Sequence, residues 1–205
     1  MSYNRTNIPV RSDPPYSDYE LIDVDPHFKR VISYFRLSDY GVWAASAAGF
    51  PLALAAWERL EPRQGAFSAP QKLPGGAIRL ATSLGCFGGF LYAYVRSSKR
   101  FLGWSENARE VKKDRYETKK LLSQGVLPFK EDKSVLDDRL QDIANRNSQF
   151  SFTTMAILPW FNWAHHPYHG VDLKKYYETR QGEENWGFKL QPLDEIKAKY
   201  AKHVD

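Results

Sequence analysis

The chain has 205 residues, of which 42% are hydrophobic and 26% are charged, so its composition fits neither a disordered protein nor a polytopic membrane protein. Its single cysteine, Cys86, excludes an internal disulfide framework and a zinc site made only of thiolates. The formal net charge of +5 is too small by itself to indicate a nucleic-acid partner.

The N-terminal part predicts an extended tail over residues 1–24, rich in Pro and Tyr and without the apolar core of a secretory signal peptide. A helix over residues 26–36 is predicted next, with Asp25 as its N-cap and Pro26 in the first helical position. One face of this helix is apolar, at Phe28, Val31, Ile32 and Phe35. This pattern indicates an interfacial amphipathic helix on a membrane surface, or alternatively a helix packed on a protein surface.

Two uncharged stretches follow and predict membrane spans at about residues 40–57 and 78–95. The first would reach roughly 27 Å and the second, from its sixteen uncharged residues, roughly 24 Å, against a hydrocarbon core of about 30 Å. The first therefore nearly fits and the second is short. The alternative is a pair of buried helices in a soluble protein.

Small residues recur at every fourth position in both stretches, which allows two helices to approach closely in lipid. The two ladders are Gly41, Ala45, Gly49 and Ala53 in the first stretch, and Ala81, Gly85, Gly89 and Ala93 in the second. We expect Gly85 and Gly89 to face Ala45, Gly49 and Ala53, or else a helix of a neighbouring protein.

The segment between the spans holds three prolines and three glycines and predicts a loop, so the two helices form a hairpin with both termini on one side. Ten Lys and Arg side chains flank the outer ends of the hairpin, against four in the loop. Positive charge favours the cytosol or the mitochondrial matrix for the termini.

Residues 105–205 are predicted to form a soluble half, helical in parts and irregular elsewhere. Residues 105–122 are highly charged and indicate a solvated or partner-bridging helix, with ion pairs Glu110–Lys113 and Glu117–Lys120. Interleaved acidic residues argue against a nucleic-acid patch there. Further elements are a helix capped by Ser134 and Asp137, an aromatic surface segment over residues 150–170, and a final helix with one apolar face at Leu193, Ile196, Tyr200 and Val204.

Three histidines, His165, His166 and His169, are the one group of metal-ligand type in the sequence. Pro167 interrupts the helical register that a pair of ligands four residues apart would need, and no fourth ligand is evident. Cys86 lies within an apolar run, where a thiol is usually inert. We therefore expect no catalytic, cofactor-binding or metal-binding residues, and no cofactor.

Three stretches together resemble a known family: DYELIDVDPHFKRVISYFRLSDY, the two small-residue spans, and PWFNWAHHPYHGVDLKKYY. They are similar to the fungal 21 kDa accessory subunit of mitochondrial NADH:ubiquinone oxidoreductase, respiratory complex I, over most of residues 18–180. The resemblance implies a non-catalytic, multi-pass subunit of the membrane arm that supports assembly and stability in the inner membrane, with both termini on the matrix side.

The partners implied are other membrane-arm subunits and inner-membrane phospholipids, with no nucleic acid and no small-molecule substrate. Two other hypotheses remain: a structural component of an inner-membrane translocase or carrier, since paired Gly-rich spans occur there too, and a soluble metalloenzyme using the three histidines.

Overall fold

The computed structural model describes residues 17–24, 26–60, 74–128 and 171–201, and all regular structure within them is helical. The elements are α1 (Phe28–Ser33), α2 (Leu37–Leu60), α3 (Gly75–Phe101), α4 (Ala108–Ser123), the short 3₁₀ helices η2 (Leu173–Tyr176) and η3 (Glu184–Trp186), and α8 (Leu193–Ala201). The mainly α class is confirmed.

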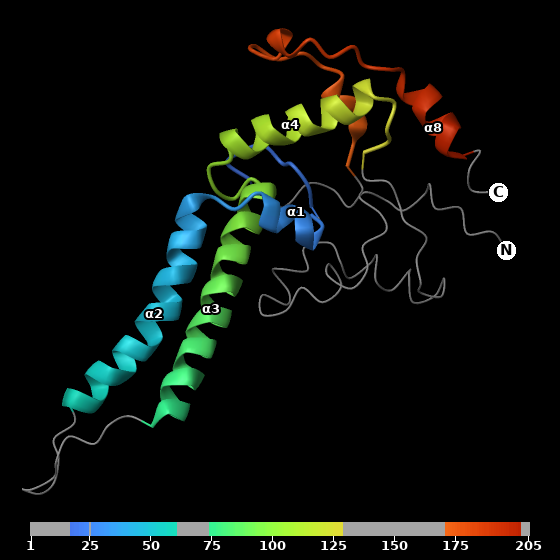
Figure 1. Ribbon diagram of the computed structural model, residues 1–205. Helices are drawn as coiled ribbons and strands as arrows, with labels where there is room; N and C mark the ends of the chain where they lie inside the picture. The colour runs from blue at the N-terminus through green and yellow to red at the C-terminus, as the bar shows by residue number, and fades with distance from the viewer. Residues whose placement is uncertain (1–16, 25, 61–73, 129–170, 202–205) are drawn as a thin grey trace, which may run out of the picture.

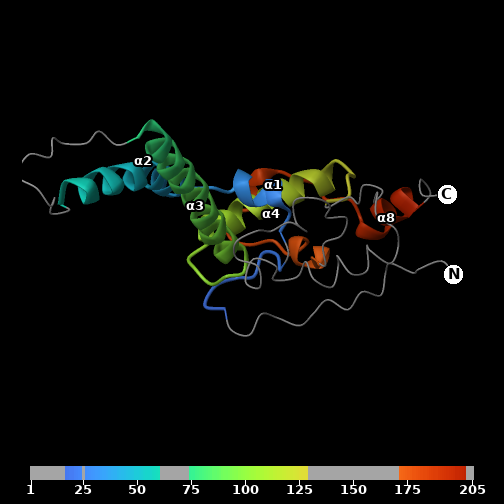
Figure 2. The ribbon, with the colours of Figure 1, turned by 90° about the horizontal axis from the view of Figure 1, so that it is seen from below.

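Helices α2 and α3 run antiparallel and side by side, as both views show (Figures 1 and 2). They have 24 and 27 residues, so each extends beyond the predicted spans at 40–57 and 78–95. Among the described helices, α3 alone is long and apolar enough to cross a membrane. The predicted span in α2 does not meet this criterion, so the hairpin of two membrane spans stays a prediction.

The glycine ladder of α3 forms the contact with α2. Ala81, Gly85, Gly89 and Ala93 are all buried. A Cβ on Gly85 would collide with the backbone oxygen of Ser46 and lie 2.9 Å from Phe50 Cβ. A Cβ on Gly89 would lie 2.7 Å from Ser46 Cβ. The two backbones can therefore approach this closely only because both positions are glycine.

The partner residues on α2 differ from those we predicted. Gly85 and Gly89 face Trp43, Ser46 and Phe50, whereas a Cβ added to Gly49 would have no atom within 4 Å. The physical reason is that one groove of small residues suffices for close approach. Here α2 contributes the small residue Ser46, the backbone carbonyl of Trp43 and the base of the Phe50 side chain.

Helix α1 packs on α3 rather than lying free for a membrane surface. It spans six residues instead of the predicted 26–36, and its N-cap is His27, whose Nδ1 accepts from the Lys29 amide, rather than Asp25. The predicted apolar face exists, but it packs against other residues of the same chain. Val31 and Phe35 are buried with Ala93 and Tyr94, and Phe28 and Ile32 pack around them. The apolar face of α1 therefore packs on α3 of the same chain, which is neither a membrane surface nor the surface of another protein.

The described end of the N-terminal tail is fastened to the end of α3. The Ile22 amide donates to the Phe101 carbonyl at 2.9 Å, and the Tyr19 amide donates to the Gly103 carbonyl at 3.2 Å. Gly103 has φ +72°, and a Cβ there would collide with the Tyr19 carbonyl, so the turn after α3 requires glycine.

Helix α4 crosses the end of the hairpin, and the C-terminal segments pack beside it (Figure 1). Leu122 of α4, Tyr176 of η2 and Ile196 of α8 form one buried apolar cluster, with Leu193 and Tyr200 packed against it. The predicted apolar face of the last helix is confirmed for these residues. Val204, the tail residues 1–16, the helix capped by Ser134, the segment 150–170 and the three histidines lie outside the described residues.

Candidate functional site: buried ion pairs at the end of the hairpin

The packed face of α4 is charged. Its buried residues recur with helical spacing, and only one of them is aliphatic: Glu110, Asp114, Arg115, Thr118, Lys119 and Leu122. The expectation of a solvated helix is wrong for this face. Buried charges are costly unless each finds a partner, so the pairs that these residues make decide how α4 is held.

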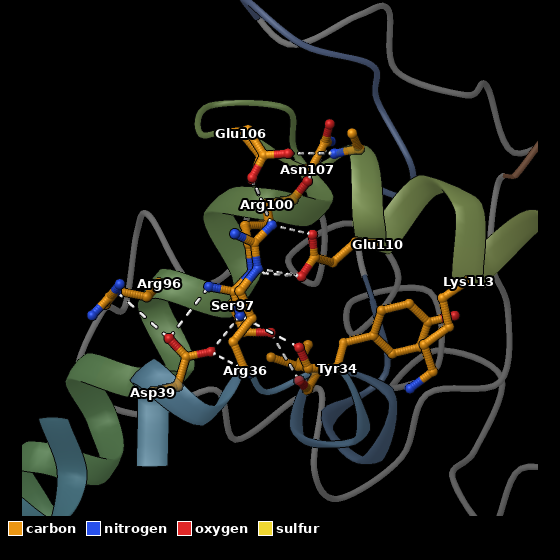
Figure 3. Close-up of polar contacts among 12 residues, drawn as sticks. Tyr34, Arg36, Asp39, Arg96, Ser97, Arg100, Glu106, Asn107, Glu110 and Lys113 are labelled. Atoms are coloured by element: carbon orange, nitrogen blue, oxygen red, sulfur yellow. Dashed lines mark hydrogen bonds and ion pairs between the residues drawn. The ribbon is translucent and has the colours of Figure 1, made fainter. Parts of the chain in front are cut away.

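Asp39 and Arg100 join the start of α2 to the end of α3 (Figure 3). The Asp39 side chain is 0% exposed and that of Arg100 is 4% exposed. Arg100 Nη2 donates to Asp39 Oδ2 at 2.5 Å, and Nη1 donates to Oδ1 at 3.3 Å. The Arg36 amide also donates to Asp39 Oδ2 at 2.8 Å, and Arg96 Nε lies 3.6 Å from Oδ1. One carboxylate thus holds the start of α2 against the end of α3.

Glu110 brings α4 into the same network. It accepts from Arg36 Nε at 2.7 Å and from Nη2 at 2.5 Å, and its Oε1 lies 3.4 Å from Arg100 Nε. Arg36 Nη2 also donates to Glu106 Oε2 at 2.8 Å. These bonds to Glu110 and Glu106 raise the pKa of Arg36, and the Arg36 guanidinium lowers the pKa of Glu106. We call Arg36, Asp39, Arg100, Glu106 and Glu110 the hairpin junction.

A second cluster connects α1 to the C-terminal half. Arg30 pairs with Asp23 at 2.9 Å and also with Asp114 of α4. The Tyr176 hydroxyl donates to the other oxygen of Asp114 at 2.7 Å. Burial lowers the pKa of Arg30, but the carboxylates of Asp114 and Asp23 outweigh this and raise it. Burial and the neighbouring Asp114 raise the pKa of Tyr176, so its phenol stays protonated as a donor.

A third cluster centres on Glu183, in the loop between η2 and η3. Its carboxylate pairs with Arg115 through both oxygens and with Lys119 Nζ at 2.6 Å, and it accepts from the Arg180 amide at 3.1 Å. The bond from Arg115, assisted by those from Lys119 and Arg180, lowers the pKa of Glu183 to about 2 from its ordinary 4.5. Glu183 therefore anchors its loop to α4.

We expect this depressed pKa to make stability fall in acid. The folded state favours the carboxylate, so the stabilisation is complete above pH 4.5 and is lost as the pH falls towards 2. Glu183→Gln removes the charge, so the variant should be less stable at pH 7 and lose this part of the pH dependence. Thermal unfolding in detergent from pH 6 to pH 2 measures both effects. Glu184→Gln, at the exposed neighbour, should keep the wild-type slope, and equal slopes for both variants would contradict the prediction.

Each carboxylate of these clusters is already held by cations, an arrangement suited to fastening helices together rather than to proton transfer or metal binding. Within the described ranges, no three His, Cys, Asp or Glu side chains group in a way that could hold a metal ion. Cys86 lies exposed on α3.

Comparison with known proteins gives the family. Residues 16–106 match the family described as NADH-ubiquinone oxidoreductase complex I, 21 kDa subunit, and residues 115–203 match the C-terminal part of the same 21 kDa subunit. The NADH-ubiquinone oxidoreductase 20.9 kDa subunit of Neurospora crassa is 43% identical over 170 residues, which are 82% of this chain and 85% of the Neurospora protein. The chain belongs to the 21 kDa subunit family of complex I. The resemblance found in the sequence is thereby confirmed.

In this member of the 21 kDa family, each matched region holds an ion pair of its own, and residues between the two regions connect them. Asp39 and Arg100 lie in the first region, and Arg115 and Glu183 lie in the second. Glu110 lies between the two, in the turn of α4 that bonds the hairpin. Asp114 lies between them as well, pairing with Arg30 of the first region and accepting from the Tyr176 hydroxyl of the second, so the buried face of α4 joins the two regions.

Sequence reasoning missed these residues because it read each helix separately. It paired Glu110 with Lys113, whereas Glu110 binds Arg36 and Arg100. Lys113 lies instead 3.8 Å from Glu117, four residues on. A signal was available: Glu110, Asp114, Thr118 and Leu122 recur every four residues and define a face.

Proposed function

We propose that this chain is a non-catalytic accessory subunit of the membrane arm of mitochondrial complex I, where it supports assembly and stability. The observation that carries the proposal is an apolar helical hairpin whose end is fastened by buried ion pairs to a polar C-terminal half. Such a chain can attach a soluble segment rigidly to a membrane assembly. Membership of the 21 kDa subunit family indicates that this membrane assembly is complex I.

The surface of the hairpin supports its insertion in a membrane. Large apolar side chains are exposed along both helices, at Phe50, Leu52, Trp57, Leu60, Ile78, Leu80, Leu84, Phe87 and Tyr92. Only 22% of the apolar segment of α3 is buried within the chain, which is low for the core helix of a soluble protein. Such an extended apolar surface is covered by lipid or by another protein in a functional state.

The lengths of the helices also support a two-span arrangement. At 1.5 Å per residue, the 24 residues of α2 reach roughly 36 Å and the 27 of α3 roughly 40 Å, beyond a hydrocarbon core of about 30 Å. Both polar flanks of the hairpin meet at one end, where α1 and α4 lie (Figure 1). We infer a multi-pass subunit of the inner membrane with both termini on the matrix side, in contact with membrane-arm subunits and phospholipids and without a cofactor.

Native electrophoresis of mitochondrial membranes in mild detergent tests the proposal. The chain is expected to migrate with the NADH dehydrogenase activity and to resist extraction by alkaline carbonate. Its deletion should reduce the amount of assembled complex while the remaining complex keeps its turnover per flavin. Migration away from that activity would contradict the proposal. A defect in protein import that precedes any respiratory defect on depletion would favour the translocase alternative.

A further inference from the structure

The outward side of α4 is lined by cations. Arg109, Lys112 and Lys120 are exposed. Together with Tyr116 they lie on one side of the helix, since residues 109, 112, 116 and 120 are spaced three or four apart. Within the described part of the chain, none of these three cations forms an ion pair. We call Arg109, Lys112, Tyr116 and Lys120 the basic patch.

The remaining cations of the same helix are all neutralised. Arg115 and Lys119 pair with Glu183, and Lys113 pairs with Glu117 and lies 4.1 Å from the centre of the Tyr34 ring. Charge on α4 is therefore largely sorted: Glu110 and Asp114 turn inward, the half-exposed Glu117 is paired with Lys113, and the positive charge without a carboxylate partner in the described residues gathers on the outside. A partner with negative charge would complement that outer side.

Tyr116 gives the basic patch a rigid aromatic centre. Its side chain is 43% exposed, yet its ring is braced by Trp186 at 5.3 Å, edge to face, and by Phe188 at 5.2 Å. Tyr and Arg are enriched at the centres of protein interfaces, and a ring that is already fixed loses little side-chain entropy when it is buried.

The position of the patch favours a protein partner over a lipid surface. Trp186 and Phe188 belong to the orange-red segment that lies beyond α4 as seen from the hairpin (Figure 1). On the hairpin side, α4 meets α1, whose neighbouring Tyr34 hydroxyl donates to Glu117 at 2.7 Å. The inner face of α4 meets the end of α3 at Arg100 and the neighbourhood of α1 at Tyr34, so the basic patch lies on the side of α4 that faces away from the apolar helices.

We propose that the basic patch docks on an acidic protein surface of a neighbouring subunit. This inference rests on the proposed accessory-subunit function, since it requires an assembly in which such a neighbour exists. The contact would combine charge pairing at Arg109, Lys112 and Lys120 with burial of the Tyr116 ring.

Chemical labelling of the intact, purified complex tests the docking directly. Lys197 on α8 is exposed and serves as the reference amine. In the assembled complex, Lys112 and Lys120 should lose most of their reactivity towards an amine-reactive reagent, relative to Lys197 and to the dissociated chain. A water-soluble carbodiimide should join Lys112 or Lys120 to an Asp or Glu of another subunit. If both amines stay as reactive as Lys197 in a complex that contains the chain, the inference fails while the proposed function stands.

Charge reversal provides a second test with a matched control. The double variant Lys112→Glu with Lys120→Glu should lower incorporation into the complex at least about tenfold, because acidic side chains would then oppose acidic ones. Lys197→Glu with Lys199→Glu, the same change on α8, should assemble normally. If the first variant instead loses only its binding to phosphatidylcholine vesicles containing cardiolipin, and assembles as well as wild type, the patch serves a lipid and the inference is wrong.

Discussion

Asp39→Asn is expected to destabilise the chain by about 3–5 kcal/mol, the cost of removing one member of a buried ion pair. Asp39 is fully buried and binds both nitrogens at the end of the Arg100 guanidinium. An amide in its place leaves that buried cation, among the described residues, with the Glu110 carboxylate at 3.4 Å and the Tyr34 carbonyl oxygen at 3.4 Å. The variant also weakens the acceptor for the Arg36 amide at the start of α2. We expect a lower unfolding temperature in detergent and a reduced amount of the chain in membranes.

Two further variants separate the ion pair from a general effect of substitution. Asp18→Asn, at an exposed position, should leave the unfolding temperature unchanged. The double variant Asp39→Leu with Arg100→Met removes both charges and should recover a large part of the stability, because no buried charge is then left alone. If the double variant is as unstable as the sum of its single changes, the pair does not hold the hairpin as described.

Gly89→Ala is expected to weaken the hairpin even though alanine is the better helix former. The added Cβ would lie 2.7 Å from Ser46 Cβ and 3.0 Å from the Trp43 carbonyl oxygen, so the helices must separate or bend. Forcing one extra methyl into a close-packed contact costs typically about 1–3 kcal/mol, more than the roughly 1 kcal/mol by which Ala is preferred to Gly within a helix. Gly85→Ala should cost at least as much, since its nearest neighbour is the Ser46 carbonyl.

The adjacent residue supplies the control. Gly88 has no atom within 4 Å of the position its Cβ would take, so Gly88→Ala should be neutral or stabilising. Thermal unfolding of the detergent-solubilised variants, together with the amount of assembled complex, measures the difference. Equal behaviour of Gly88→Ala and Gly89→Ala would mean that α2 does not lie on this side of α3.

Local sequence determined the helices themselves. Uncharged runs with small residues predicted the helices α2 and α3. Apolar residues at helical spacing predicted the packed faces of α1 and α8. Periodicity carries this information because a helix places residues three and four apart on one side, whatever packs there. The motifs around residues 18–40 and 159–177 were likewise enough to indicate the family.

Only the tertiary structure decided which faces meet. The α3 ladder was predicted at the helix contact, but the row of α2 against it was not, because both rows of α2 have helical spacing and the choice depends on how the two helices rotate against each other. The ion pairs of the hairpin junction could not be predicted from the sequence for a related reason. Asp39 and Arg100 are 61 residues apart, and Arg36 and Glu110 are 74 apart, so their pairing follows from how α4 crosses the hairpin. The spacing of charged residues along a helix is the same whether their side chains face water or a buried partner of opposite charge. Only the packing of the other helices determines which of these two environments each side chain has.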